Sequence, residues 1–422
     1  MGKAIEMMIS KKRRAFYAIL LFLAVCVFAV RHLATPSLHE AAANGYLGDV
    51  KKRIEGGAHL EVRDEYGQTP LYLASQEGRG AIAQYLIEAG ADVDAPDKFG
   101  QTPMYAAARS GHAALVKMLV ESGADVEAQT SPGKTPLYAA CLYERNKRAA
   151  DYLLDVGADI SVKTRDGTSL LGIAENAEIA ERLIQLGLNP NATEERGNTP
   201  LHYVHDKAKA EVLIEHGANV DAVSDSGRTP LFGHVQRGNL AVVKALLEHG
   251  ANVNARSKDE TTPILAATRN AEMMALLSSH GARLDAKGRD GSSLLHLASS
   301  PDVAEFLIDQ GMDLEALDNA GNTPLHRAVE SGRQGVLKLL IRKGCNIDAK
   351  NANGQTALHT AFHPIKGCIH IQKSFSSSQL SVSQTLVRHG IAVGIVDKFG
   401  KTALDYAKSH GFHEAATFLT ER

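Results

Sequence analysis

Short apolar segments recur along the chain in pairs, each opened by a polar residue and closed by a glycine. In one such pair, Thr69-Pro70 precedes the apolar segment 71–75, and Gly78 follows it. The second segment, 81–88, ends at Gly90. A threonine hydroxyl caps a helix, proline suits the first helical turn, and glycine accepts the left-handed conformation in which many helices end. The pattern therefore predicts two short helices followed by an extended finger.

The same pattern returns at a fixed period. The phrase Gly-x-Thr-Pro-Leu occurs at 67–71, 133–137, 197–201, 227–231 and 321–325. The threonines at 69, 102 and 135 are evenly spaced. A period of about 33 residues is the signature of a solenoid, in which each unit buries its apolar faces against its neighbours. We therefore predict an all-α solenoid of helix–turn–helix units, with one extended finger per repeat.

One copy of the phrase carries a family signature. The residues Thr-Pro-Leu-His-Arg-Ala at 323–328 closely resemble the Thr-Pro-Leu-His-x-Ala signature of the ankyrin repeat. The resemblance covers residues 35–422 and implies an ankyrin-repeat solenoid of about twelve repeats, with capping repeats at its ends. It also implies a non-catalytic domain that binds a protein partner through its finger tips and the first helices of its repeats.

The repeat length changes in two ways. The intervals 169–199, 199–229, 262–293 and 293–323 are all shorter than the interval 69–102. The missing residues fall between the two helices, so we expect a shorter bend and intact stacking faces. In contrast, the interval from Thr356 to Thr402 is much longer than the others, which places an insertion near 362–380. Pro364 and Gly367 within it indicate an irregular loop.

The N-terminal residues differ from the repeats. A basic segment, 1–14, ends in Lys-Lys-Arg-Arg and precedes sixteen uncharged, mostly apolar residues at 15–30. As a helix this stretch would span roughly 24 Å, close to the ~30 Å apolar core of a bilayer. Arg14 and Arg31 could reach the lipid headgroups and close the gap. We therefore predict a transmembrane or signal-anchor helix over 15–34.

Two alternatives for this segment stay open: a cleaved signal peptide, which would make the protein secreted, and a buried helix. Val27 and Ala29 form a passable cleavage site. For the anchor, the basic residues before the span predict a single-pass protein with a cytoplasmic N-terminus and repeats on the far side of the membrane. Cys141, Cys345 and Cys368 form no disulfide framework and weigh slightly against an oxidising compartment.

Charge is divided unevenly along the chain. Residues 1–34 hold six basic side chains and one acidic one, so the remainder carries 40 basic and 47 acidic side chains. Nucleic-acid binding needs a basic footprint, which the repeats lack. We therefore expect a protein partner and, through residues 15–34, a membrane, but no nucleic acid.

The residues that could carry chemistry lie mostly at fixed repeat positions. Histidine or tyrosine occupies one position of the first helix, and we interpret all of these as structural: His39, His202, His296, His326, His359, Tyr72, Tyr105 and Tyr138. The chain contains no phosphate-binding loop, no Gly-x-Ser-x-Gly and no His-Glu-x-x-His. We therefore expect neither enzymatic activity nor a cofactor.

One alternative gives the insertion a metal. His359, His363, Cys368 and His370 could converge on a zinc ion, which would make the protein metal-responsive. Their spacing matches no familiar ligand pattern, so we favour a solvated loop without a metal.

Candidate partner-binding residues lie in the second to fourth repeats. Two finger tips carry aromatic residues, and the ends of the first helices carry polar, charged or aromatic ones. The candidates are Tyr66, Gln76, Glu77, Phe99, Arg109 and Tyr143. Aromatic and arginine side chains dominate the energetics of protein interfaces. Later finger tips are plainer, apart from Phe399. The sequence thus favours a membrane-anchored interaction scaffold, with a secreted effector and a metal-responsive protein as alternatives.

Overall fold

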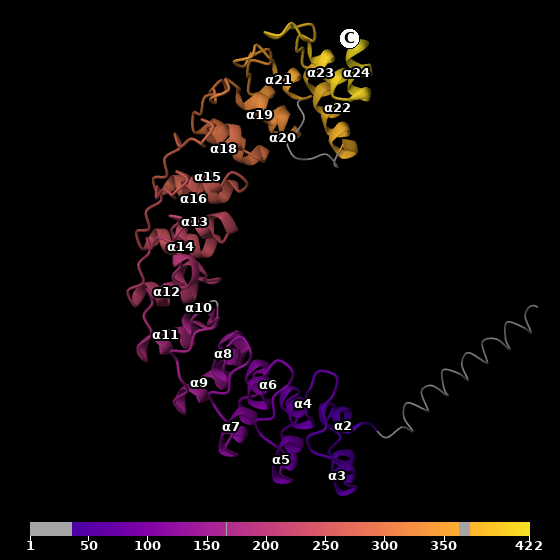
Figure 1. Cartoon of the computed structure of the whole chain (residues 1–422). Helices are drawn as coiled ribbons and strands as arrows, with labels where there is room; N and C mark the ends of the chain where they lie inside the picture. The colour runs from indigo at the N-terminus through magenta and orange to yellow at the C-terminus, as the bar shows by residue number, and fades with distance from the viewer. Residues whose placement is uncertain (1–35, 166, 363–371) are drawn as a thin grey trace, which may run out of the picture. The chain divides into compact units, whose positions relative to one another are not determined.

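The computed structural model describes residues 36–165, 167–362 and 372–422 (Figure 1). Every regular element in these residues is a helix, and their one β contact is an isolated bridge between Lys287 and Ser293. Helices pair along the chain, and an extended finger joins each pair to the next. The predicted all-α repeat fold is confirmed.

The described chain forms two compact units, one ending at Ile179 and the other starting at Ala180. The first contains α2 (Leu38–Asn44), α3 (Leu47–Glu55), α4 (Pro70–Gln76), α5 (Gly80–Glu88), α6 (Pro103–Ser110), α7 (Ala113–Glu121), α8 (Pro136–Cys141), η1 (Glu144–Asn146), α9 (Lys147–Asp155) and α10 (Leu170–Ile173). The division falls within α11 (Ala177–Gln185).

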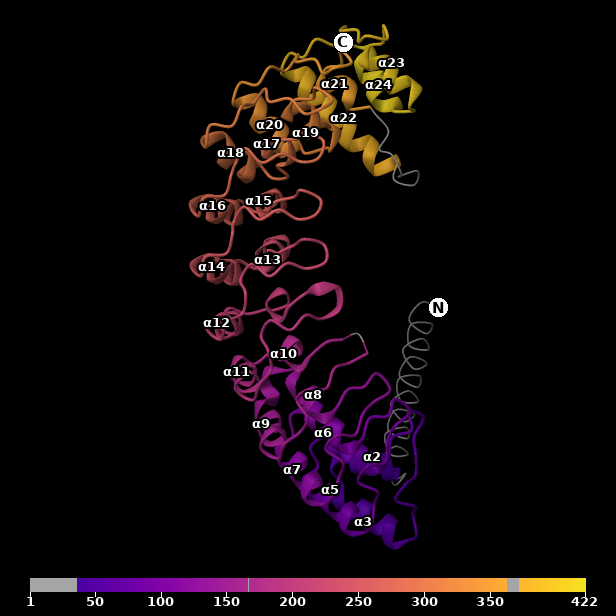
Figure 2. The ribbon, with the colours of Figure 1, turned by 60° about the vertical axis from the view of Figure 1, so that its left-hand side comes forward.

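The second unit continues the same alternation. It contains η2 (Glu195–Gly197), η3 (Pro200–His202), α12 (Lys207–Glu215), α13 (Pro230–Arg237), α14 (Leu240–Glu248), α15 (Pro263–Ala266), α16 (Ala271–Ser279), α17 (Leu294–Leu297), α18 (Pro301–Asp309), α19 (Pro324–Glu330), α20 (Gln334–Arg342), α21 (Ala357–Thr360), α22 (Gln372–Arg388), α23 (Ala403–Ser409) and α24 (His413–Thr420). Figure 2 shows the second helices α14 and α16 stacked in one row and the first helices α13 and α15 in another.

The second helix is nearly constant in length, whereas the first helix is not. The second helices from α3 to α20 each have nine residues. The first helices have eight residues in α6 and α13, but only four in α10, α15 and α17 and three in η3. The short repeats therefore lose residues from the end of the first helix, so the deletions shorten that helix itself and not only the bend that was expected to shorten.

The Thr-Pro and glycine residues set the helix ends as predicted. The hydroxyl of Thr69 accepts a hydrogen bond from the backbone N–H of Tyr72 at 3.2 Å, and Pro70 occupies the first helical position. After the second helix, Gly90 adopts a φ of +93°, a conformation that costs most other residues about 1 kcal/mol or more.

The core of each unit lies between the first and second helices. The leucines of the Thr-Pro-Leu phrase are 0 or 1 % exposed: Leu71, Leu137, Leu201, Leu231 and Leu325. Alanines fill the narrow space where helices approach, as at the fully buried Ala74 and Ala107. Cys141 takes such a position and is buried, whereas Cys345 is only half-buried.

Carbonyl groups at the ends of the first helices are bound by side chains of the following repeat. Such carbonyls lack intrahelical partners. A side chain at the start of the next second helix donates to them, in the pairs Arg79 with Ala43, Asn146 with Arg109, Asn239 with His205 and Arg333 with Ala298. Because these bonds join consecutive repeats, they hold the stack together as well as satisfying the helix ends.

The signature histidines are structural, as predicted. Nδ1 of His326 lies 2.9 Å from the hydroxyl of Thr323 in its own repeat, and Nε2 lies 3.0 Å from the carbonyl oxygen of Gln355 in the next finger. His296 makes the same two contacts, with Ser293 and Asn322. Burial lowers the pKa of both imidazoles, although the carbonyl hydrogen bonds oppose that shift.

The insertion is partly helical. Helix α22 (Gln372–Arg388) has 17 residues and extends back into the serine-rich segment. The irregular loop expected over 362–380 is therefore wrong from Gln372 onward, and residues 363–371 lie outside the described residues. Phe362, at the start of the insertion, is fully buried with its ring centroid 5.5 Å from that of Phe412.

The predicted basic segment 1–14 and membrane helix 15–34 lie outside the described residues. Among the helices of the described ranges, none combines the length and apolarity that a membrane crossing requires.

Candidate partner-binding surface

The finger tips of Tyr66 and Phe99 rest on tight turns held by the first side chain of each finger, Asp64 and Asp97. In the third repeat, Oδ1 of Asp97 accepts the backbone N–H groups of Phe99 and Gln101, both at 2.8 Å. Neighbouring fingers are joined by a backbone bond, in which the N–H of Lys98 donates to the carbonyl of Tyr66 at 3.0 Å. The tip side chains of the first unit therefore stand on a hydrogen-bonded base.

Tyr66 and Phe99 occupy successive tips and are exposed. Tyr66 is 53 % exposed and Phe99 57 %. A side chain packed onto the neighbouring finger would lose most of that area. The two rings thus form an exposed aromatic pair on adjoining fingers of the first unit.

The polar candidates lie at the ends of the adjacent first helices α4 and α6. Gln76 ends α4 and Glu77 follows it, with the Gln76 amide 3.4 Å from Oε1 of Glu77. Arg109 lies in the last turn of α6, and its side chain is exposed. The carbonyls of Gln76 and Arg109 bind His112 and Asn146 of the following repeats. Their backbones are therefore fixed.

Tyr143 differs from the other candidates. It lies between α8 and η1 and is half-buried. The guanidinium of Arg145 covers its ring, 4.4 Å from the centroid. A partner would contact a cation–π pair at this position rather than a free aromatic ring.

Sequence reasoning missed a set of exposed apolar residues in the second unit. Val223 is 62 % exposed, Leu317 57 % and Val396 54 %. Each stands immediately before the residue that opens a finger, a position at which Lys163 and Lys350 stand in other repeats. The signal was present as exposed-position apolar residues in a register position that charged residues hold in several other repeats. Phe399, the expected exception among later tips, is 66 % exposed.

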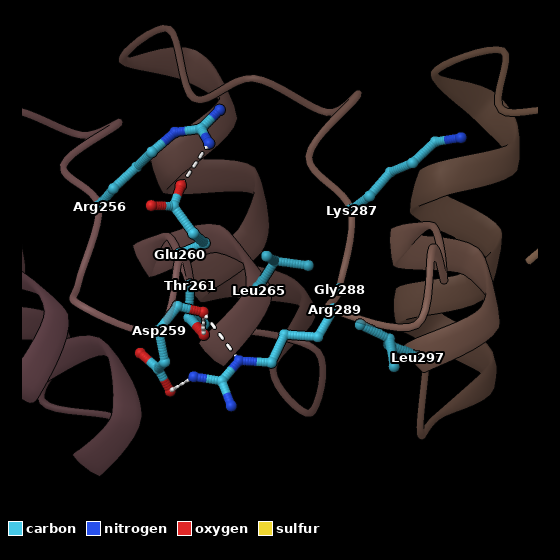
Figure 3. Close-up of a pocket in the computed structure, with 9 residues that line it drawn as sticks. All are labelled: Arg256, Asp259, Glu260, Thr261, Leu265, Lys287, Gly288, Arg289 and Leu297. Atoms are coloured by element: carbon cyan, nitrogen blue, oxygen red, sulfur yellow. Dashed lines mark hydrogen bonds and ion pairs between the residues drawn. The ribbon is translucent and has the colours of Figure 1, made fainter. Parts of the chain in front are cut away.

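Sequence reasoning also missed a hollow between two fingers of the second unit (Figure 3). It has a volume of about 290 Å³ and is lined by Arg256, Asp259, Glu260, Thr261, Leu265, Lys287, Gly288, Arg289 and Leu297. Figure 3 shows Arg256 and Lys287 on opposite sides of the gap. The available signal was the pair Glu260 and Gly288, which interrupts the usual finger sequence.

The metal alternative finds no site in the described part of the chain. No group of three or more potential ligands converges there. The imidazole of His359 contacts the hydroxyl of Thr356 and the carbonyl of Lys401, at 2.9 and 3.2 Å. His363, Cys368 and His370 lie outside the described residues.

Comparison with protein families identifies the repeats. The family model for three copies of the ankyrin repeat matches residues 38–130, 170–257, 235–318, 264–351 and 300–373, and the single-repeat model matches 132–165. The chain belongs to the ankyrin-repeat family. Ankyrin-repeat domains are typically protein-binding scaffolds and are generally non-catalytic.

Similar curated proteins match only short stretches of this ankyrin array. Human neurogenic locus notch homolog protein 2 is 42 % identical over 79 residues, 18 % of this chain and 3 % of that protein. Human protein phosphatase 1 regulatory subunit 27 is 46 % identical over 50 residues, 12 % of this chain and 32 % of that protein. A putative ankyrin repeat protein of fowlpox virus is 43 % identical over 51 residues, 11 % of this chain and 12 % of that protein. The chain thus spans a minor part of each relative's length.

A solved structure is similar over half of the chain. The ankyrin repeat domain of human ASB11 aligns with 51 % of this chain and 99 % of its own, at 27 % identity and a TM-score of 0.45.

Proposed function

We propose that the chain is a non-catalytic scaffold that binds a protein partner through the finger tips and first-helix ends of its second to fourth repeats. Tyr66 and Phe99 would supply the apolar contact, and Arg109 the charged one. Gln76, Glu77 and the Tyr143–Arg145 pair would form a polar rim. Aromatic and arginine anchors surrounded by polar groups are the usual anatomy of a protein interface.

The observation that carries the proposal is the exposure of two aromatic rings on adjoining, hydrogen-bonded fingers. Tyr66 and Phe99 are each more than half exposed, while the backbones below them are joined by the bond from Lys98 to Tyr66. A rigid base lowers the entropy lost when the rings are immobilised by a partner.

The test is a triple substitution, Tyr66→Ala, Phe99→Ala and Arg109→Ala, in the full-length chain. We expect at least tenfold weaker binding to a partner captured from the native source, which corresponds to ~1.4 kcal/mol. Helix content and melting should change little, because exposed substitutions usually cost under ~0.5 kcal/mol. Phe399→Ala is the matched control, since Phe399 occupies the same Asp-Lys-Phe-Gly phrase in the last finger. Unchanged affinity of the triple variant would refute this surface.

We further propose that residues 15–34 anchor the scaffold in a membrane, with the N-terminus in the cytoplasm and the repeats on the far side. Support comes from the apolar run at 15–30 and the basic lead before it. The full-length protein should resist carbonate extraction, and deletion of residues 1–34 should release the repeats. N-terminal sequencing of the purified protein tests the secreted alternative, because a start near Val30 would mean cleavage and no anchor.

A further inference from the structure

One pair of neighbouring fingers in the second unit lacks the backbone bond that joins the others. Where both fingers are described, an N–H of one donates to a carbonyl of the previous one: Lys98 to Tyr66, Ser131 to Phe99, Arg165 to Pro132, Asp225 to Arg196, Lys258 to Ser226, Asn319 to Asp290, Ala352 to Ala320 and Lys398 to Asn353. Between fingers 257–262 and 288–293 this bond is absent. The guanidinium of Arg289 donates to the carbonyl of Asp259 instead, at 3.1 Å. We call this pair the open junction.

Three residue changes coincide there. Glu260 stands at the position of the finger glycine and adopts a φ of +61°. Gly288 stands where the neighbouring fingers begin with Ser257 and Asp318, so it has no side chain to hold its turn. Leu265 stands where His296 of the next repeat bridges to the following finger. Both links between the fingers are lost together, and the 290 Å³ hollow opens between them.

The hollow has one more cation than its carboxylates neutralise. Arg256 pairs with Glu260 at 2.8 Å, and Arg289 lies 3.7 Å from Asp259. Lys287 is exposed and makes no ion pair with any described residue. Figure 3 shows its side chain on the finger opposite Arg256, with the ammonium group directed away from Arg256 and Glu260. The site therefore favours a ligand with a single negative charge.

Unused hydrogen-bond donors surround the same place. The backbone N–H of Arg289, whose counterparts in other fingers donate to the previous finger, has no acceptor among the described residues. A second hollow of about 290 Å³ adjoins the first, shares Arg256 and Lys287 with it and is also lined by Thr262. Thr262 is 7 % exposed, and its hydroxyl oxygen has no hydrogen-bond partner among the described residues. A buried hydroxyl without a partner is destabilising, and a bound acceptor would remove that cost.

The floor of the hollow is apolar. Leu265 and Leu297 line it from α15 and α17, and both are half-buried. An aliphatic stem could lie on these leucines while its charged end reaches Lys287. A glutamate side chain has this composition. Phosphate lacks the stem, and its higher charge would be repelled by Asp259 and Glu260.

The neighbouring fingers extend the pattern. Val223, Arg256, Lys287 and Leu317 occupy the same register position in four successive fingers, each directly after an alanine. Val223 and Leu317 are 62 % and 57 % exposed. The row is thus apolar, cationic, cationic and apolar.

We propose that the open junction binds a glutamate side chain of an acidic segment in a partner protein, with apolar residues of that segment lying on Val223 and Leu317. The carboxylate pairs with Lys287 and accepts from the N–H of Arg289 or the hydroxyl of Thr262. The stem contacts Leu265 and Leu297. The assignment to a protein rests on the proposed scaffold function, whereas carboxylate binding does not.

The test uses methyl-labelled full-length protein and the probe peptide acetyl-Gly-Val-Glu-Gln-Leu-Gly-amide, which carries a single negative charge. We expect saturable shifts of the Leu265 and Leu297 methyl resonances, and at least fivefold weaker binding by Lys287→Met. Lys350→Met is the matched control. Lys350 holds the same register position beside an intact finger bond, from Ala352 to Ala320, and its substitution should leave binding unchanged.

Three results would overturn the proposal. They are equal binding of the peptide with glutamine in place of glutamate, equal loss with Lys350→Met, and inorganic phosphate competing as strongly as the glutamate peptide. The variant Glu260→Gly provides a second test. It removes the carboxylate that pairs with Arg256, so the peptide should bind more tightly to this variant than to the wild type. The Tyr66, Phe99 and Arg109 variant should bind the peptide normally. If that triple variant still binds a native partner as tightly as the wild type, the surface around Tyr66 and Phe99 is refuted. The proposed glutamate site at the open junction is not affected by that result.

Discussion

Two junctions of the second unit differ in how their repeats are joined, although both follow a shortened repeat. The closed junction joins the η3–α12 repeat to the α13–α14 repeat, and the open junction joins the α15–α16 repeat to the α17–α18 repeat. The first of these repeats spans the interval 199–229 and the second the interval 262–293. Since repeat length is nearly the same, side chains rather than spacing decide whether the fingers are joined.

The closed junction is joined at three levels. Its fingers are linked by the backbone bond from Asp225 to Arg196 at 2.8 Å. Nε2 of His202 lies 3.1 Å from the carbonyl of Arg228 in the next finger. From the following repeat, His234 contacts the carbonyl of Leu201 at 3.0 Å. The carbonyl of Leu201 in the truncated η3 thus gains a partner that a longer helix would have supplied itself.

The open junction lacks the first two of these contacts, which are the backbone bond between the fingers and the histidine bridge to the next finger. Glu260, Leu265 and Gly288 replace the residue types that make them, and a lined hollow takes their place. A solenoid whose stability is a sum over repeats and their interfaces can tolerate one weak interface when its neighbours are strong. A ligand site at the open junction therefore weakens only one interface between repeats and leaves the stability of the others unchanged.

The largest effect we expect is a loss of the closed junction in acid. Burial lowers the pKa of His234 to about 4, although its hydrogen bond with the Leu201 carbonyl favours the charged form. In the unfolded chain the pKa is ~6.5. Because the unfolded state takes up the proton first, stability should fall as pH drops from ~6.5 toward 4, by about 3 kcal/mol.

Hydrogen exchange of α13 amides, expressed as protection factors, measures this effect locally. The helix α20 amides of the same chain provide the comparison. Protection in α13 that is independent of pH between 7 and 4.5 would show that His234 is not held neutral.

The second prediction concerns Gly227, the glycine of a finger that is joined to the next finger by a backbone hydrogen bond. In Gly227→Ala, the new Cβ would lie 2.5 Å from the backbone nitrogen of Lys258, at a φ of +75°. We expect about 2–3 kcal/mol of destabilisation, from the clash together with the left-handed strain. Gly238→Ala is the matched control, because Gly238 has a φ of +73° and nothing within 4 Å of an added Cβ. Equal urea midpoints for the two variants would mean that finger contact contributes nothing.

The third prediction concerns His296, which occupies the position in its repeat that Leu265 occupies at the open junction. His296→Leu removes the contacts with Ser293 and with the carbonyl of Asn322. We expect about 2 kcal/mol of destabilisation, because a buried hydroxyl and a carbonyl lose their partner. The reciprocal variant, Leu265→His, should stabilise the open junction and reduce the hollow. Both are measured by denaturant unfolding, and a stable His296→Leu protein would show that the bridge is dispensable.

The fold followed from the sequence because its determinants are local. Thr69, Pro70 and Gly90 act within a few residues of themselves, so a repeated phrase was enough to place the helices and their caps. The open junction was not predicted, since Glu260 and Gly288 belong to different fingers and matter only when those fingers lie side by side. The helical start of α22 was missed for another reason, because Pro364 and Gly367 indicated a loop and the helix begins only after them, at Gln372.

The smallest effect is a gain in stability at the open junction. Glu260→Gly removes a side chain from a left-handed residue, which relieves up to about 1 kcal/mol of backbone strain. The ion pair with Arg256 that is lost connects side chains 71 % and 64 % exposed, and such pairs contribute little. We therefore expect a gain of up to about 1 kcal/mol in the free energy of unfolding.

Glu260→Ala separates the two contributions, because it removes the carboxylate but keeps a Cβ at the same φ of +61°. It should leave the free energy of unfolding close to that of the wild type, so that the gain belongs to glycine alone. If alanine stabilises as much as glycine, the carboxylate and not the backbone was the strained feature. The open junction would then differ from the closed ones by charge rather than by conformation.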